Sequence, residues 1–171
     1  MLNRLAIFGA ALAMLIASQV DAAPLDAQSV RSFVQSFYTW YASGVHDVSP
    51  LEVVLAKRPS VLSPELFRAL KADDDAQRKV PDDIVGLDFD PFLNSQEQAG
   101  RYTVGAITMS DGIYRVEVRD LHSKQPAVIA QVASGDGKPV FVNFLYPGNG
   151  DLLRILKTLA RERAQPSSQA R

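Results

Sequence analysis

Cysteine is absent from this chain of 171 residues. That absence excludes disulfide bonds, thiolate catalysis, a thioether-linked lipid and a cysteine-ligated zinc site. Histidine is scarce as well, because the chain has only His46 and His122. Neither belongs to an H-E-x-x-H pattern, so a metal centre would need carboxylates, and two solvent-exposed turn histidines are the simpler interpretation. The sequence also has no G-x-S-x-G, P-loop or G-x-G-x-x-G spacing, so no hydrolase nucleophile or nucleotide site is indicated.

An excess of one charge is missing too. Eighteen Lys and Arg residues stand against nineteen Asp and Glu residues, which gives a net charge of −1. This balance argues against nucleic acid as the main partner. With no metal or nucleotide motif present, we expect no cofactor.

No hydrophobic run is long enough to span a bilayer. The apolar run at residues 5–17 falls short of the roughly 20 residues that a spanning helix needs. Arg4 precedes it, and Val20 and Ala22 occupy the −3 and −1 positions of a cleavage site. This pattern predicts a signal peptide at residues 1–22 that is removed on export, so that the product is periplasmic and meets the membrane only during export. An uncleaved membrane anchor is the alternative. We expect one domain over 23–164 and a disordered polar tail over 165–171.

The first half of the remaining chain has helical periodicity. Apolar residues spaced by three and four predict a helix within 23–44. Ser49, with Glu52 three residues later, resembles a capping box and predicts a short second helix through residue 56. Ser63, followed by Pro64, predicts the start of a third helix that ends before residue 81. Residues 81–100 have no period and are predicted to form a long loop.

The second half changes to a period of two. Asp111-Gly112 and Asp136-Gly137 are typical of two-residue hairpin turns. Centred on these turns, the first hairpin pairs Gly105 with Val118, and the second pairs Ile129 with Phe144. In that register the second hairpin is apolar on both faces. Strands 127–145 are then either covered on both sides by the protein or meet a partner, for example in a homodimer. A last helix is predicted from about residue 151.

These elements predict an α+β fold in which N-terminal helices pack on a four-stranded antiparallel meander, with a C-terminal helix added. The segments SFVQSFYTWYASG (32–44), LSPELFRALKADDD (62–75) and GLDFDPFLNSQE (86–97) resemble a bacterial family of exported small proteins and lipoproteins. That resemblance implies a domain of unknown function with a cystatin-like or nuclear-transport-factor-2-like cone. It also implies a non-enzymatic envelope role, as an immunity protein against a toxin or as a partner of an outer-membrane complex. This chain departs from the lipoprotein members because it has no lipid-bearing cysteine.

The most distinctive feature is the acidic segment, residues 73–97, where eight acids stand against two bases. It would attract a basic protein such as a cell-wall hydrolase toxin. Asp88, Asp90 and Asn94 are a calcium candidate, although Leu93 stands where an EF-hand loop requires glycine, and a solvated acidic loop is the alternative. Phe89 and Phe92 are either exposed anchors or core residues. The candidate binding residues are Asp82, Asp83, Asp88, Phe89, Asp90, Phe92 and Glu97 here, with Arg115 and Arg119 from a charged row on a later strand.

Three functions follow from these patterns. The first is a protein-binding module that acts through its surface without a cofactor. The second is a carrier with a small ligand inside the cone, which requires an apolar cavity. The third is an enzyme that uses buried carboxylates, Asp88 and Asp90, with Tyr38 or Tyr114 as acid or base. The binding module is favoured because no catalytic motif is found.

Overall fold

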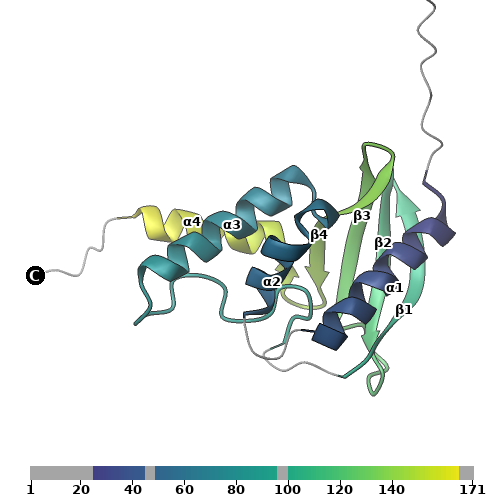
Figure 1. Cartoon of the computed structure of the whole chain (residues 1–171), viewed down its shortest axis with the longest axis horizontal. Coiled ribbons are helices and arrows are strands. Elements are labelled where there is room, and N and C mark those ends of the chain that lie inside the picture. Colours follow the sequence, from purple (N-terminus) through teal and green to yellow (C-terminus); the bar gives the residue numbers. More distant parts are fainter. Residues whose placement is uncertain (1–24, 45–48, 96–99, 166–171) are drawn as a thin grey trace, which may run out of the picture.

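In this computed structural model, residues 25–44, 49–95 and 100–165 are described (Figure 1). The predicted signal peptide, most of the predicted tail, His46 and Glu97 lie outside these ranges. The helices are α1 (Ala27–Gly44), α2 (Pro50–Lys57), α3 (Pro64–Lys79) and α4 (Leu152–Ala164), with a 3₁₀ turn at Pro59–Val61. The strands are β1 (Tyr102–Ser110), β2 (Ile113–Asp120), β3 (Val128–Gly135), β4 (Lys138–Tyr146) and β5 (Gly150–Asp151).

The predicted α+β class is confirmed, with one strand more than expected. The strands form one antiparallel sheet in the order β1-β2-β3-β4-β5. The extra strand, β5, has two residues and pairs with the end of β4 just before α4 begins. So short a strand leaves no period in the sequence, which is why the alternation predicted only four.

Local capping explains where two of the helices start. The Ser63 hydroxyl accepts a hydrogen bond from the Leu66 amide at 3.2 Å, as predicted for α3. At the start of α4, the Asp151 carboxylate accepts one from the Arg154 amide at 3.0 Å. The predicted capping box of α2 is wrong, because the Ser49 side chain makes no capping hydrogen bond. That helix begins with the favourable φ angle of Pro50 instead.

Both hairpin turns form as predicted. Asp111 and Asp136 adopt positive φ angles of 53° and 50°, and each is followed by a glycine that also has positive φ. Near the turns the predicted pairing holds, as for Thr108 opposite Arg115. Two-residue Asp-Gly turns tolerate this backbone geometry without strain and therefore fix the register locally.

Farther from the turns, a bulge in each hairpin shifts the register. Val104, not Gly105, pairs with Val118, and Ala130, not Ile129, pairs with Phe144. Because a bulge adds one residue to one strand, it moves every later side chain to the other face. The two-sided apolar hairpin predicted at 127–145 is therefore wrong in detail, since Phe144 joins the buried face.

The core lies where α1 crosses one face of the sheet (Figure 1). Phe37 of α1 packs against Phe141 with ring centroids 4.9 Å apart, and Phe92 packs against Phe144 at 5.4 Å. These four rings are at most 2% exposed. Aromatic side chains thus fill the space between helix and sheet that an open cone would leave as a cavity.

Polar side chains of α1 satisfy the backbone of β1 around its bulge. Gln35 donates to the Tyr102 carbonyl and accepts from the Val104 amide, both at 3.1 Å. Arg31 donates to the carbonyls of Val104 and Gly105 at 3.0 Å. Because β1 is an edge strand, these bonds from α1 satisfy backbone groups that face no neighbouring strand.

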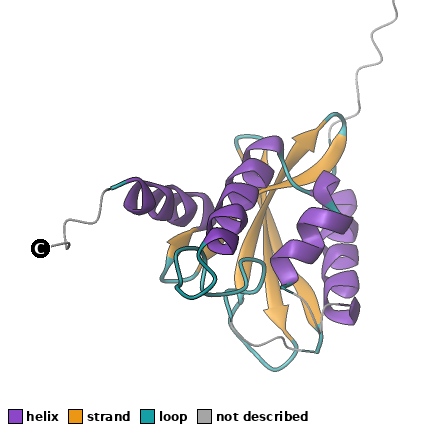
Figure 2. Ribbon diagram, turned by 60° about the vertical axis from the view of Figure 1, so that its left-hand side comes forward, coloured by secondary structure: helices purple, strands orange, loops and turns teal. Residues whose placement is uncertain are grey.

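The other three helices lie at the β4–β5 end of the sheet, with α4 on the side far from α1 (Figure 2). Among the residues that the structure describes, no helix combines the length and the hydrophobicity needed to cross a membrane.

Candidate functional site

Asp90 is a partly buried carboxylate in a turn held by tyrosines. Its Oδ2 accepts a hydrogen bond from the Tyr41 hydroxyl at 2.6 Å, and its Oδ1 accepts one from the Phe92 amide at 2.8 Å. The hydroxyls of Tyr38 and Tyr146 donate to the carbonyls of Phe92 and Pro91, both at 2.7 Å. Three tyrosines from α1 and β4 therefore fasten this turn to the core.

The electrostatics of this turn follow from burial. Burial raises the pKa of Asp90 to about 6, although hydrogen bonds from the Tyr41 hydroxyl and from backbone amides oppose the rise. Burial, together with the charge of Asp90, raises the pKa of Tyr41 and of Tyr146 far above the usual range. The tyrosines are thus permanent donors, while Asp90 can take up a proton near pH 6.

The predicted acid–base pair is not the one that forms. Tyr41, rather than Tyr38 or Tyr114, is the tyrosine that contacts Asp90. Tyr38 donates to a loop carbonyl, and Tyr114 donates to the Leu25 carbonyl at 2.5 Å. Both Asp90 oxygens already accept protein hydrogen bonds, so the arrangement fits an anchor for the turn better than a base that faces a substrate.

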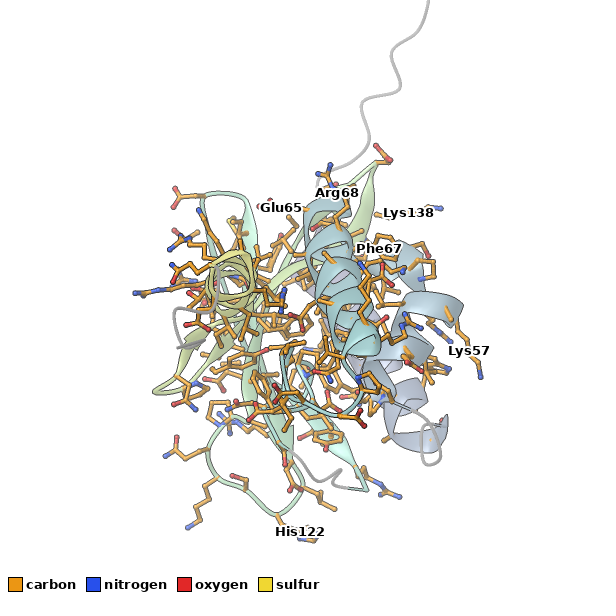
Figure 3. All side chains as sticks on the ribbon, turned by 90° about the vertical axis from the view of Figure 1, so that its left-hand side faces the viewer. Lys57, Glu65, Phe67, Arg68, His122 and Lys138 are labelled. Carbon is orange, nitrogen blue, oxygen red and sulfur yellow. The ribbon has the colours of Figure 1, made fainter. Side chains whose placement is uncertain are left out.

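The calcium candidate receives no support from the described residues. Asp88 is exposed, and both Asp90 oxygens already accept hydrogen bonds, from the Tyr41 hydroxyl of α1 and from the Phe92 amide. Across the described ranges, no group of three or more histidine and acidic side chains could hold a metal ion. His122 lies exposed in the turn between β2 and β3 (Figure 3).

The prediction that Phe92 is an exposed anchor is wrong. Its side chain is 0% exposed and completes the aromatic core beside Phe37 and Tyr41. Phe89 is partly buried and packs edge-on against Tyr146, with ring centroids 5.5 Å apart. The hydrophobic effect favours burial of both rings, and the tyrosine-held turn brings them to the core.

Residues 80–88, here called the anchored loop, follow α3 and are held by side chains of that helix. Gln77 Oε1 accepts hydrogen bonds from the amides of Val85 and Gly86, both at 3.0 Å. Gln77 Nε2 donates to the Asp83 carbonyl at 2.7 Å and to the Val80 carbonyl at 3.3 Å. One glutamine thus satisfies four backbone groups of a segment that has no regular structure.

An ion pair between α3 and α4 fixes the far end of the anchored loop. Asp73, whose side chain is 3% exposed, binds Arg163 of α4 at 2.6 Å. The other Asp73 oxygen accepts from the Leu87 amide at 2.9 Å, and Arg163 donates to the Val85 carbonyl at 2.7 Å. Gly86 fits closely here, because a Cβ at that position would come within 2.9 Å of the Asp73 carboxylate. The loop therefore has a fixed backbone.

The anchored loop exposes its three aspartates and an aliphatic side chain. Asp82, Asp83 and Asp88 are exposed, and so is Ile84, at 71%. The aspartates were predicted from the sequence and Ile84 was not, although an aliphatic residue inside an acidic run was the available signal. Gln77 was not predicted either, because bonds from a glutamine to backbone groups leave no pattern in a sequence.

Two members of the charged row on the outer face of the sheet pair with each other. Arg119 forms an ion pair with Glu117, whose carboxylate also accepts from the Ala106 amide at 3.4 Å. Arg115 is exposed on the same strand. On the neighbouring strands, Ile129 and Leu145 are partly buried and share that outer face. The homodimer contact through strands 127–145 stays a prediction.

No family model matches this chain, and no curated protein or solved structure matches it either. The resemblance to an exported bacterial family therefore remains a prediction.

Proposed function

We propose that this chain is an exported protein-binding module that recognises a basic partner protein in the cell envelope through its anchored loop. The observation that carries the proposal is the contrast between backbone and side chains in that loop. Gln77, Asp73 and Arg163 hold its backbone, while acidic side chains and Ile84 remain exposed. A loop that is already ordered loses little conformational entropy on binding.

The chemistry of the loop defines the partner. Asp82 and Asp83 would attract a positively charged surface and orient it during encounter. Ile84, between these aspartates and the buried end of the loop, would enter an apolar pocket of the partner. An exposed aliphatic side chain surrounded by acids thus matches a basic surface with an apolar depression at its centre.

The cellular setting rests on the N-terminal sequence and on the family resemblance. A signal peptide at residues 1–22 would deliver the domain to the periplasm. The resemblance favours an immunity protein that blocks a secreted toxin, or a partner of an envelope complex. The cystatin-like or nuclear-transport-factor-2-like cone belongs to the same proposal.

Photo-crosslinking from the anchored loop tests this function. Benzoylphenylalanine would replace Ile84 in the full chain, expressed in the bacterium that produces it. Met109 and Leu121, which are 61% and 55% exposed, provide matched control positions away from the loop. We expect one discrete adduct from position 84 that is absent from the two controls. The adduct should weaken when Asp82 and Asp83 are both changed to Asn. No adduct at 84, or the same adducts at all three positions, would refute the proposal.

An enzyme, third in the sequence analysis, moves ahead of the carrier because burial raises the pKa of Asp90 to about 6, within the range of a general base. If Asp90 were catalytic, Asp90→Asn would abolish the biological activity while the crosslink from position 84 persisted. If Asp90 only holds its turn, the variant should keep both. The rings packed between α1 and the sheet weigh against the carrier.

A further inference from the structure

A groove of about 630 Å³ runs between α3 and α4, and no residue of the anchored loop lines it. Figure 3 views this helix pair close to the axis of α4, with Glu65 and Arg68 labelled on the first turns of α3. Ala69 and Ala72 of α3 and Leu153 and Ala160 of α4 line the groove. Because three of these four side chains are methyl groups, the floor is apolar and a partner can approach the helices closely.

Three cations lie along the α4 side of the groove. Arg154, Lys157 and Arg161 all line it and are exposed. Their spacing of three and then four residues places them on one face of α4, over roughly 10 Å of helix. Like charges at this spacing repel one another. None of the three forms an ion pair with any residue in the described part of the chain.

A fourth cation lines the groove but, unlike the other three, it forms an ion pair. Arg163 is bound to Asp73 and to the Val85 carbonyl, so it serves the anchored loop. Glu65 is the groove's acid on the α3 side. The three cations on α4 therefore form a positive rim, and an anionic partner would relieve their mutual repulsion.

The shape of this surface distinguishes between anionic partners. A flat lipid bilayer would meet the cations but would not reach an apolar floor that lies between two helices. A ridge of side chains on a helix can reach both the floor and the rim, as in the helix-in-groove mode of recognition. The chain's own last residues, 165–171, contain no acid and do not match the rim.

We propose that the α3–α4 groove binds an acidic amphipathic helix of a partner protein. Its acids recur at i, i+3 and i+7 opposite Arg154, Lys157 and Arg161, and its small apolar side chains enter the floor. This inference is independent of the anchored loop, because it concerns another surface of the opposite charge.

The test uses a synthetic helix as the probe. A fluorescein-labelled peptide of about 18 residues, long enough to form helix alone, would carry Glu at i, i+3 and i+7 on one edge and Ala and Leu on its apolar face. A second peptide would have Gln in place of every Glu. Fluorescence anisotropy would give the dissociation constants for the purified chain of residues 23–171. We expect saturable binding of the Glu peptide only.

Two variants localise the binding. Changing Arg154, Lys157 and Arg161 together to Gln should weaken binding about tenfold, as expected for the loss of three exposed ion pairs. Ala72→Leu, at an exposed helix position, should weaken it by filling the floor without changing any charge. Circular dichroism would verify that both variants fold. The matched control changes three exposed lysines elsewhere to Gln and should stay within about twofold; these are Lys57, Lys124 and Lys138.

Three outcomes would overturn the proposal. The first is equal binding of the Glu and Gln peptides. The second is equal weakening by the control variant, which would indicate a non-specific charge effect. The third is that the chain binds phosphatidylglycerol vesicles but not the Glu peptide, and that the triple variant abolishes the vesicle binding. This result would assign the three cations to a membrane surface.

Discussion

Replacing Asp90 with Asn would remove a carboxyl group whose ionisation opposes folding. Burial raises its pKa from 3.8 to about 6, so the folded protein binds this proton more tightly than the unfolded chain does. The sign follows by linkage: the stabilisation from this group is complete below about pH 4 and is lost as the pH rises through about 6. The difference between the two pKa values corresponds to about 3 kcal/mol of unfolding free energy.

The asparagine keeps the shape of the side chain and removes the titration. At pH 8 the variant escapes the penalty for a buried negative charge. The hydrogen bond that the Tyr41 hydroxyl donates to the carboxylate is already included in that penalty, because it opposes the rise of the Asp90 pKa. We therefore expect Asp90→Asn to be more stable than wild type by about 3 kcal/mol at pH 8. At pH 4, where wild type is largely protonated, the two should be equal within about 1 kcal/mol.

Urea unfolding between pH 4 and pH 8 measures this difference. The single tryptophan, Trp40, lies between Phe37 and the Arg58 guanidinium, so its fluorescence will report the loss of tertiary structure. Asp82→Asn removes a charge from an exposed position nearby and is the matched control. The reasoning fails if the stability difference between wild type and Asp90→Asn does not change with pH. It fails equally if the variant is destabilised at pH 8 by more than about 2 kcal/mol, because the ionised form would then be required.

Three further substitutions and one control test the packing by the same urea assay. Gly86→Ala should lower the unfolding free energy by about 1–3 kcal/mol, because its Cβ would meet the Asp73 carboxylate. In the control, Gly100→Ala, the added Cβ meets no atom within 4 Å, so the unfolding free energy should change by less than about 0.5 kcal/mol. Equal effects of the two substitutions would argue against the close fit at Gly86. Arg163→Met should lower the unfolding free energy by about 3 kcal/mol, because it leaves the Asp73 carboxylate buried without its cation. An unchanged urea midpoint would mean that this ion pair is unimportant for stability. Phe92→Ala should cost about 3–5 kcal/mol as a core residue; a surface-like loss below about 1 kcal/mol would contradict its burial.

The parts of the fold that could be predicted from the sequence are those with local causes. Ser63 ahead of a proline marks the start of α3, and the Asp-Gly pairs mark both hairpin turns, because each signal acts within a few residues. Gln35 and Arg31 lie in α1 and hydrogen-bond to the β1 backbone beside the bulge only in the folded chain. No short window of sequence contains these contacts or marks the bulge, so the register beyond the bulge was predicted wrongly.

In the candidate site, too, features with local causes could be predicted and features that depend on distant residues could not. The exposure of Asp82 and Asp83 follows from composition, since an unpaired aspartate is seldom buried. Their fixed placement depends on Gln77 and on the ion pair between Asp73 and Arg163, whose members are 90 residues apart. The sequence therefore indicated which side chains the loop would expose and gave no sign that its backbone is anchored.

Amide hydrogen exchange of the anchored loop tests most directly whether this surface is prepared for binding before a partner arrives. The Val85, Gly86 and Leu87 amides should exchange as slowly as those of the flanking helix α3, although they lie outside any helix or strand. In Gln77→Ala, protection should vanish at Val85 and Gly86 and persist at Leu87, which Asp73 holds. Exchange of all three amides at the rate of an unstructured peptide in the wild-type protein would contradict the account.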